Sequence, residues 1–364
     1  MAFRNSMSAV HRFLEAGARL VADNRPYGCL ALVFLACSLP ATAAELDRIR
    51  TMALAGSVFK VEAIKVGGGY SLGTAVSVGP GKFVTNCHVT RDAEIVMLVR
   101  GGARWRAASE RSDLYLDLCL LQVPGLEGVP AVPLTRARDL HLAQEVAAAG
   151  YTGGGGLQMH AGTVSALHDL NGSKVIQTTT AFTSGASGGA LFDAQGKLAG
   201  ILTFRLRGAD GYYFAAPVEW IADRIDSPDG YVAVAPLNGP PPFWAQPVAS
   251  LPFFMQAASL EVDGRWNDLL TLTDRWTQHE QRNPEPWFLR GNSYAKLDRV
   301  DSAVGAYRNA VALDPLYTWA WLNLGKAYVK LGALDDAREV AKVLRNLDAD
   351  LADQLAASVE PSSR

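Results

Sequence analysis

The chain has 364 residues, of which 49% are hydrophobic and 19% are charged. This composition is typical of globular proteins and excludes a chain that is disordered throughout. Because one domain usually takes roughly 100–200 residues, we expect two folded units. The 34 basic and 36 acidic side chains give a formal net charge of −2, so the chain lacks the basic excess that favours nucleic-acid binding.

Residues 1–44 have the pattern of a secretory signal peptide. No residue between 27 and 44 is charged, arginines precede this stretch, and Ala41-Thr42-Ala43 matches a small-x-small cleavage site. We therefore expect an exported protein, periplasmic or secreted. The acidic residues in the long segment before the apolar stretch leave an uncleaved membrane anchor open, and Leu35-Ala36-Cys37 resembles the end of a lipoprotein box.

Short strand-like segments separated by glycine-rich turns fill the next part of the chain, from about residue 55 to 235. Many short strands at this spacing predict an all-β sandwich or barrel. The first helical period appears only at residues 218–225. The strand-like segments include residues 57–61, 74–78, 82–85, 93–99 and 118–123.

Ser187 lies in a glycine-rich turn, in the segment TSGASGGALF of residues 183–192. A serine hydroxyl becomes a good nucleophile only when a base removes its proton and hydrogen-bond donors stabilise the oxyanion. The N–H groups of Gly185 and Ser187 would supply those donors. The turn alone is also compatible with a purely structural role, so its partners have to be found.

His88 is the candidate base because it directly follows a strand-like segment, in VTNCHV. The candidate carboxylate is Asp117, an acid within the apolar run YLDLCLL, where an unpaired charge would be costly. Asp113 has a more polar setting and is the less favoured choice. The other histidines lie in the export segment, in the helical part, or among polar and loop residues: His11, His141, His160, His168 and His279.

The order and local motifs of His88, Asp117 and Ser187 resemble those of the chymotrypsin-like serine proteases, and most closely the bacterial HtrA type. The resemblance covers about residues 50–230. It implies two six-stranded β-barrels with the triad between them, in which His88 is general base and then general acid, Asp117 orients His88, and Ser187 forms the acyl-enzyme. The implied activity is that of a serine endopeptidase on protein or peptide substrates, without a cofactor or metal. A decayed, catalytically inactive scaffold is the alternative.

Departures from that family carry further expectations. Ala186 replaces the usual aspartate and no Ile-Val-Gly-Gly activation sequence follows the signal, so activity should not need zymogen cleavage. Helical repeats occupy the place where HtrA-type proteins usually carry a PDZ domain. By resemblance the S1 pocket is lined by residues without a carboxylate, which predicts a small or medium apolar P1 residue. These lining residues are Ala181, Thr203, Phe204 and Phe214.

Removal of the signal peptide would leave two cysteines, Cys87 and Cys119. This count predicts neither a disulfide scaffold nor a zinc site. We favour two small buried thiols. A disulfide between them, in an oxidising compartment, is the alternative.

The C-terminal part is helical and repetitive. Residues 45–234 should form the protease domain, and the proline-rich residues 235–252 should form an extended, semi-rigid linker because proline fixes φ. Residues 253–350 show a 34-residue period that resembles the tetratricopeptide (TPR) repeat, and residues 351–364 read as a polar tail. The residues that recur after 34 positions are Trp287, Gly291, Tyr294 and Asp301 with Trp321, Gly325, Tyr328 and Asp335.

A degenerate repeat around Gly264 and Leu269 should precede these two. The resemblance implies protein–protein interaction through the repeats, and a rigid cap without ligands is the alternative.

Overall fold

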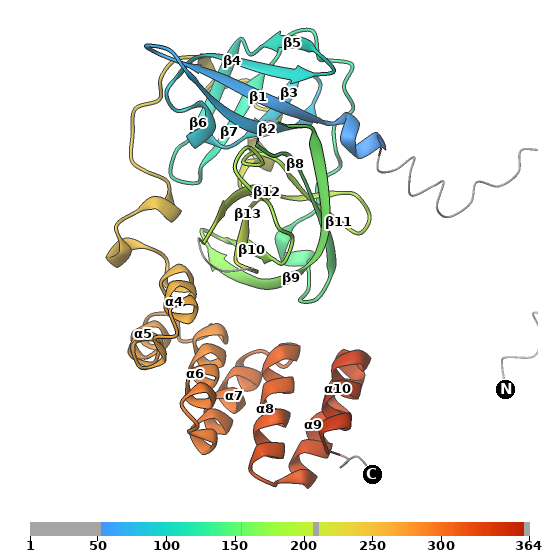
Figure 1. Cartoon of the computed structure of the whole chain (residues 1–364), viewed down its shortest axis with the longest axis vertical. Helices are drawn as coiled ribbons and strands as arrows, with labels where there is room; N and C mark the ends of the chain where they lie inside the picture. Colours follow the sequence, from blue (N-terminus) through green and yellow to red (C-terminus); the bar gives the residue numbers. More distant parts are fainter. Residues whose placement is uncertain (1–51, 154, 207–210, 360–364) are drawn as a thin grey trace, which may run out of the picture. The chain divides into compact units, whose positions relative to one another are not determined.

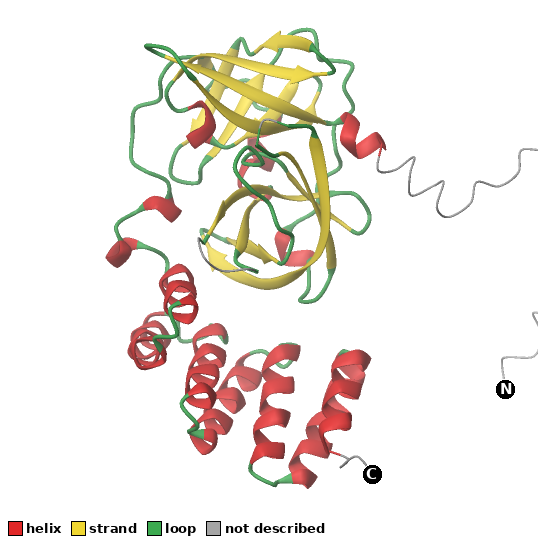
Figure 2. Ribbon diagram, viewed as in Figure 1, coloured by secondary structure: helices red, strands yellow, loops and turns green. Residues whose placement is uncertain are grey.

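The computed structural model describes residues 52–153, 155–206 and 211–359. The predicted signal peptide, residues 1–44, lies outside the described residues. A β-rich part is followed along the chain by an array of helices, so the predicted fold class is confirmed (Figures 1 and 2). Within the described ranges, no helix is both long enough and apolar enough to cross a membrane.

The first sheet has eight strands, two more than the six expected for each barrel. Their order is β14-β6-β7-β3-β2-β1-β4-β5, and every pair is antiparallel. The side chains of β1 alternate between fully and partly buried, as expected of a strand with one face on a core. That core contains Phe59, Phe83, Leu98 and Leu121, all without exposed surface. The strands are β1 (Val58–Lys65), β2 (Tyr70–Gly79), β3 (Lys82–Thr85), β4 (Ala93–Arg100), β5 (Ala103–Arg106), β6 (Ser109–Asp113), β7 (Leu118–Gln122) and β14 (Val232–Ala233).

The second sheet closes into a six-stranded barrel in the order β10-β13-β12-β11-β8-β9. His160 and His168, expected among polar or loop residues with no flanking strand pattern, both lie in the long strand β9; the expectation of no strand there was wrong. Polar and exposed residues are common along β9, so its strand pattern is hidden in the sequence. The strands are β8 (Glu145–Tyr151), β9 (Leu157–Leu170), β10 (Ser173–Thr178), β11 (Ala190–Asp193), β12 (Leu198–Arg205) and β13 (Tyr213–Pro217).

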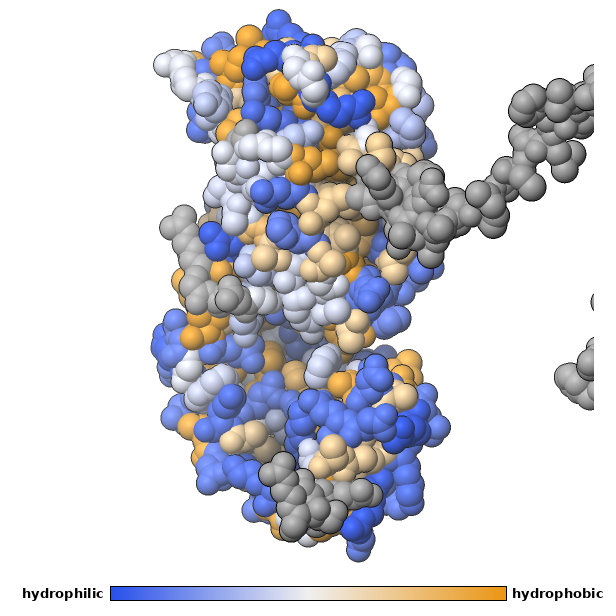
Figure 3. Space-filling model, turned by 45° about the vertical axis from the view of Figure 1, so that its right-hand side comes forward, coloured by the Kyte–Doolittle hydropathy of each residue, from blue (hydrophilic) through white to orange (hydrophobic). Residues whose placement is uncertain are grey.

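Three short 3-10 helices and the helices α2 (Cys87–Thr90) and α3 accompany the sheets, and helices α4 to α10 form the C-terminal array (Figure 1). In Figure 3, hydrophilic residues cover much of the lower part of the molecule, where the array lies. The elements are η1 (Ala137–Asp139), α3 (Glu219–Ile225), η2 (Phe243–Ala245), η3 (Val248–Ser250), α4 (Phe253–Val262), α5 (Trp266–His279), α6 (Glu285–Lys296), α7 (Val300–Leu313), α8 (Thr318–Lys330), α9 (Leu334–Leu347) and α10 (Ala349–Val359).

The small residues of the repeat sit where neighbouring helices come closest. A Cβ added at Gly291 in α6 would collide with the ring of Tyr307 in α7. A Cβ at Gly325 in α8 would collide with Leu355 in α10. The 34-residue pattern therefore marks positions of close helix packing.

Two segments differ from their expected conformations. Residues 351–359, expected in a polar tail, lie in α10, where Ala352, Leu355 and Val359 are buried against the array. Their apolar side chains recur at intervals of three and four residues, so an amphipathic helix fits them better than a tail. In the expected linker, residues 235–252, Phe243 is fully buried in a core shared with the barrels. This segment is packed onto the β-rich part and is more than a spacer.

Candidate active site

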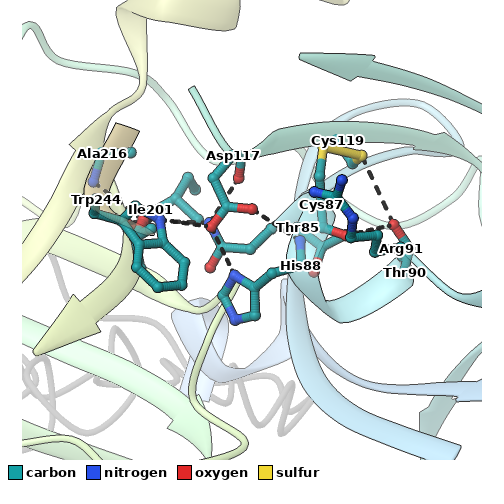
Figure 4. Close-up of polar contacts among 12 residues, drawn as sticks. Thr85, Cys87, His88, Thr90, Arg91, Asp117, Cys119, Ile201, Ala216 and Trp244 are labelled. Carbon is teal, nitrogen blue, oxygen red and sulfur yellow. Dashed lines mark hydrogen bonds and ion pairs between the residues drawn. A yellow bond between two sulfur atoms is a disulfide. The ribbon is translucent and has the colours of Figure 1, made fainter. Parts of the chain in front are cut away.

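His88 lies in α2 (Cys87–Thr90), a single helical turn that follows β3. The sequence placed it at a strand end, and the turn comes two residues after that end. His88 Nδ1 lies 2.6 Å from Asp117 Oδ2, and the backbone N–H of His88 donates to Asp117 Oδ1 at 2.8 Å (Figure 4). His88 therefore contacts the carboxylate twice, once through its imidazole and once through its backbone N–H.

Asp117 is held between β6 and β7 with its side chain only 1% exposed. Its φ of 61° is in the left-handed region, which aspartate tolerates better than most residues. The side-chain amide of Asn86 donates to the carbonyl oxygen of Asp117 at 2.9 Å, and the N–H of Cys87 donates to the same oxygen at 3.3 Å. The two residues that precede His88 thus fix the backbone of its carboxylate partner.

The carboxylate of Asp113 is not among the contacts of His88. This carboxylate accepts a hydrogen bond from Arg224 at 2.8 Å and another from the N–H of Leu116 at 3.1 Å. Of the two acids considered from the sequence, Asp117 is the one that contacts the imidazole.

Ser187 lies in the loop between β10 and β11 and is partly exposed. Glycine is required beside it, because a Cβ at Gly188 would collide with the carbonyl oxygen of Thr74 and its φ is 84°. Thr74 in β2 fixes the loop: its N–H donates to the carbonyl of Ser187 at 2.8 Å, and its hydroxyl donates to the carbonyl of Gly185 at 2.8 Å. The serine loop is therefore anchored to the same sheet that carries His88.

The N–H groups of Gly185 and Ser187 donate no hydrogen bond to any other described residue. Gly185 has a φ of 97°, a conformation that suits glycine. Two unused donors in one glycine-rich loop are what a developing oxyanion needs. Over the same residues, no hydrogen bond joins the Ser187 hydroxyl to His88; such bonds are often long in a free enzyme and tighten in the substrate complex.

The four residues expected around the S1 pocket lie in different settings. Ala181 is exposed in the loop before Ser187, and Phe204 at the end of β12 is 8% exposed. Thr203 is buried and its hydroxyl donates to the carbonyl of Ile201 at 2.7 Å. Phe214 in β13 is fully buried and stacked on Phe204, with ring centroids 4.6 Å apart. Their contact with substrate stays a prediction.

Cys87 and Cys119 form a disulfide, with their Cα atoms 5.0 Å apart (Figure 4). The favoured prediction of two free thiols was wrong. The register of β3 against β7 pairs Thr85 with Cys119, which brings the start of α2 over Cys119. Strand pairing of this kind could not be read from the spacing of the two cysteines, and the bridge ties the turn that carries His88 to the strand after Asp117.

Trp244 is a site residue that the sequence reasoning missed. Its indole Nε1 donates to Asp117 Oδ2 at 3.1 Å, and its ring meets the His88 ring edge-on with centroids 5.4 Å apart. The residue belongs to the proline-rich segment that was expected to be a linker. The adjacent aromatic residues Phe243 and Trp244 could have indicated that this segment is packed, since exposed linkers rarely contain large aromatic side chains.

The site holds no obvious place for a metal ion: among the described residues no three His, Cys, Asp or Glu side chains come together as ligands. The site combines an imidazole oriented by a buried carboxylate with a glycine-flanked serine.

Comparison with known proteins matches residues 73–201 to the trypsin-like peptidase domain and residues 291–332 to the TPR repeat. Serine endoprotease DegS of Salmonella typhimurium is 31% identical over 158 residues, which is 40% of this chain and 44% of DegS. A probable periplasmic serine endoprotease of the DegP-like type from Halomonas elongata is 32% identical over 165 residues, 43% of this chain and 35% of that protein.

The chain thus spans less than half the length of these relatives. Among solved structures, that of the HtrA-type protease AlgW with tripeptide is 32% identical, with a TM-score of 0.44 over 48% of this chain and 60% of AlgW. The chain carries a trypsin-like peptidase domain homologous to HtrA-type serine proteases, followed by a TPR repeat region.

Proposed function

We propose that the chain is a serine endopeptidase in which Ser187 is the nucleophile, His88 the base and Asp117 the orienting carboxylate. The observation that carries this proposal is the 2.6 Å contact between His88 Nδ1 and a carboxylate oxygen that is almost fully buried. A proton on Nδ1 is held there by Asp117, which leaves Nε2 free to accept a proton from a serine hydroxyl. The activity that follows is hydrolysis of peptide bonds in a protein substrate.

The proposed reaction has two halves. Ser187 Oγ attacks the scissile carbonyl as His88 Nε2 takes its proton, and the N–H groups of Gly185 and Ser187 stabilise the oxyanion. His88 then gives this proton to the leaving amine, and an acyl-enzyme remains on Ser187. Water, deprotonated by His88, cleaves the ester and restores the serine. Asp117 stabilises the imidazolium in both halves.

Reaction with a fluorophosphonate probe tests this proposal directly, because the probe phosphonylates only an activated serine. We expect the full chain to be labelled and Ser187→Ala to abolish the labelling. Ser184→Ala is the matched control, since Ser184 lies exposed on the same loop and its hydroxyl makes no hydrogen bond to a described residue. Equal labelling of wild type and Ser187→Ala, or none of either, contradicts the proposal and favours an inactive scaffold.

We also propose that the protein is exported, as the names of its periplasmic relatives suggest, and that the helical array binds an acidic protein segment. A groove lined by residues of α4 to α8 supports this second point. Lys296, Lys326 and Lys330 are exposed beside it; Glu261 is the one carboxylate in the lining, and Asp298 forms an ion pair with Lys330, which leaves an excess of positive charge. Excess positive charge favours an acidic partner.

Binding of a fluorescent polyglutamate peptide at two salt concentrations tests the groove. We expect Lys326→Glu to weaken binding strongly. Lys342→Glu, an exposed change in α9 away from the groove, should weaken it little. Equal effects of the two variants would indicate only nonspecific charge attraction.

A further inference from the structure

The segment after the second barrel contacts both loops that carry the catalytic pair. The N–H of Leu237 donates to the carbonyl of Arg91, just after α2, at 2.7 Å. The guanidinium of Arg91 donates back to the carbonyl of Pro240 at 3.2 Å. Farther along, the N–H of Phe243 donates to the carbonyl of Tyr115, two residues before Asp117, at 2.9 Å. The segment is thus fastened to the His88 loop at one end and to the Asp117 loop at the other.

Phe243 anchors this segment in the apolar core. Its side chain is fully buried, and its ring lies 5.7 Å from that of Phe204 and 5.9 Å from that of Trp220, both nearly perpendicular to it. Edge-to-face aromatic contacts at these distances are favourable. Such an anchor fixes the backbone position of the next residue, Trp244.

Trp244 lies against the catalytic pair itself. Its indole stacks on Phe204 with centroids 5.6 Å apart and an interplanar angle of 16°. Its Nε1 donates to Asp117 Oδ2, which is also the oxygen that His88 Nδ1 contacts. Figure 4 shows the carboxylate between the two rings. With the backbone N–H of His88 on Oδ1, the Asp117 carboxylate has three donors.

We propose that Trp244 is a positioning residue, supplied from outside the two barrels, that holds the Asp117 carboxylate in the orientation that His88 needs. This inference rests on the proposed function. The carboxylate is 1% exposed, so water cannot replace a lost donor easily, and the indole offers one donor in one direction. Without that donor, the two hydrogen-bond contacts that remain on the carboxylate both come from His88, so no other described residue holds its orientation relative to the imidazole.

The consequence is that the catalytic unit extends beyond residue 234. Residues 237–244 complete it, and the same segment continues into α4, the first helix of the array. Phe254 in α4 stacks on His168 of the second barrel with centroids 4.3 Å apart. The segment is therefore held at both its ends, and Trp244 has a defined position relative to Asp117.

Trp244→Phe tests this proposal in the full chain, because it keeps an aromatic ring and removes only the N–H and the smaller part of the indole. The matched control is Trp220→Phe: Trp220 contacts the same anchor, Phe243, and its buried Nε1 has no hydrogen-bond partner among the described residues. Two quantities should be compared, the rate of fluorophosphonate labelling and the downfield proton NMR signal of the His88 Nδ1–H.

We expect Trp244→Phe to slow labelling about tenfold, since a hydrogen bond to a buried charge is lost, and to shift the Nδ1–H signal. Trp220→Phe should leave the signal unchanged. Trp244→His, which restores a ring N–H, should recover part of both properties. An unchanged signal and labelling rate in Trp244→Phe, or equal changes in Trp220→Phe, would overturn the proposal.

The NMR signal separates this proposal from the proposed function. If the wild type does not react with the probe but Trp244→Phe alone shifts the signal, the endopeptidase proposal fails and the positioning of Asp117 by Trp244 stands. If the wild type reacts and the signal is the same in all variants, the positioning proposal fails and the endopeptidase proposal stands.

Discussion

Removal of the Cys87–Cys119 disulfide should both destabilise the protein and slow the reaction of the candidate site with a fluorophosphonate probe. The two cysteines are 32 residues apart in sequence. In the chain-entropy treatment, a bridge that closes a loop of this length restricts the unfolded chain by about 4 kcal/mol. We therefore expect Cys87→Ala/Cys119→Ala to lower the free energy of unfolding by a few kcal/mol.

The site should also respond, because Cys87 precedes His88 and Cys119 lies two residues after Asp117. Without the bridge, β3 and β7 still pair through their backbones, so the strands should remain and α2 should loosen. We expect slower fluorophosphonate labelling with the sheet content unchanged by circular dichroism.

Urea unfolding of the full chain with and without dithiothreitol measures the effect. The wild type should unfold at lower urea concentration when reduced, and the double alanine variant should not respond to reductant. Alkylation followed by peptide mapping adds a direct check: the peptides that contain the two cysteines should be modified only after reduction. Modification without reduction, or identical unfolding curves of wild type in both conditions, would refute the reasoning.

Two further predictions concern the glycine beside Ser187 and the pH dependence of stability. Gly188→Ala should abolish fluorophosphonate labelling and lower the free energy of unfolding by about 3 kcal/mol, because its φ is strained and its Cβ collides with Thr74. Gly172→Ala is the control, since Gly172 has a φ of 74° but no atom near the added Cβ. It should lower the free energy of unfolding by about 1 kcal/mol and keep the labelling. Burial lowers the pKa of His168, but the Glu285 carboxylate 2.6 Å away, the hydrogen bond to Gln177 and the charge of Glu261 together outweigh burial, so the pKa is raised overall. The pair then stabilises the folded state fully below about pH 6.5 and loses this effect as the pH rises through the raised pKa. Urea unfolding should show Glu285→Gln to be most destabilising at low pH; a loss that is independent of pH would contradict the assignment.

Local motifs allowed the three candidate triad residues to be predicted from the sequence. His88, Asp117 and Ser187 each stand out within a few neighbours, by a strand end, an apolar run or flanking glycines, and these signals survive without knowledge of the fold. The TPR period was readable for the same reason, since Gly291 and Gly325 mark close helix contacts that recur every 34 residues.

Features that depend on long-range pairing could not be read in this way. The disulfide depends on the register of β3 with β7, and the role of Trp244 depends on where a proline-rich segment folds back. Composition predicted an extended linker there; it could show neither the two short 3-10 helices in that segment nor the burial of Phe243. The polar composition of residues 351–364 suggested a tail. Residues 351–359 instead belong to α10, because side chains such as Leu355 pack against the array beside Gly325.

The fastening of residues 237–244 to the loops of His88 and Asp117 also sets an order of events during synthesis. All strands of both barrels except the short β14 precede residue 218, so most of the sheet pairing can form while the later chain is still being made. The contacts of Phe243 with Tyr115 and of Trp244 with Asp117 have to wait for the segment to emerge. A nascent chain would thus hold the paired strands of both sheets while the candidate site stays incomplete until residues 237–244 have emerged.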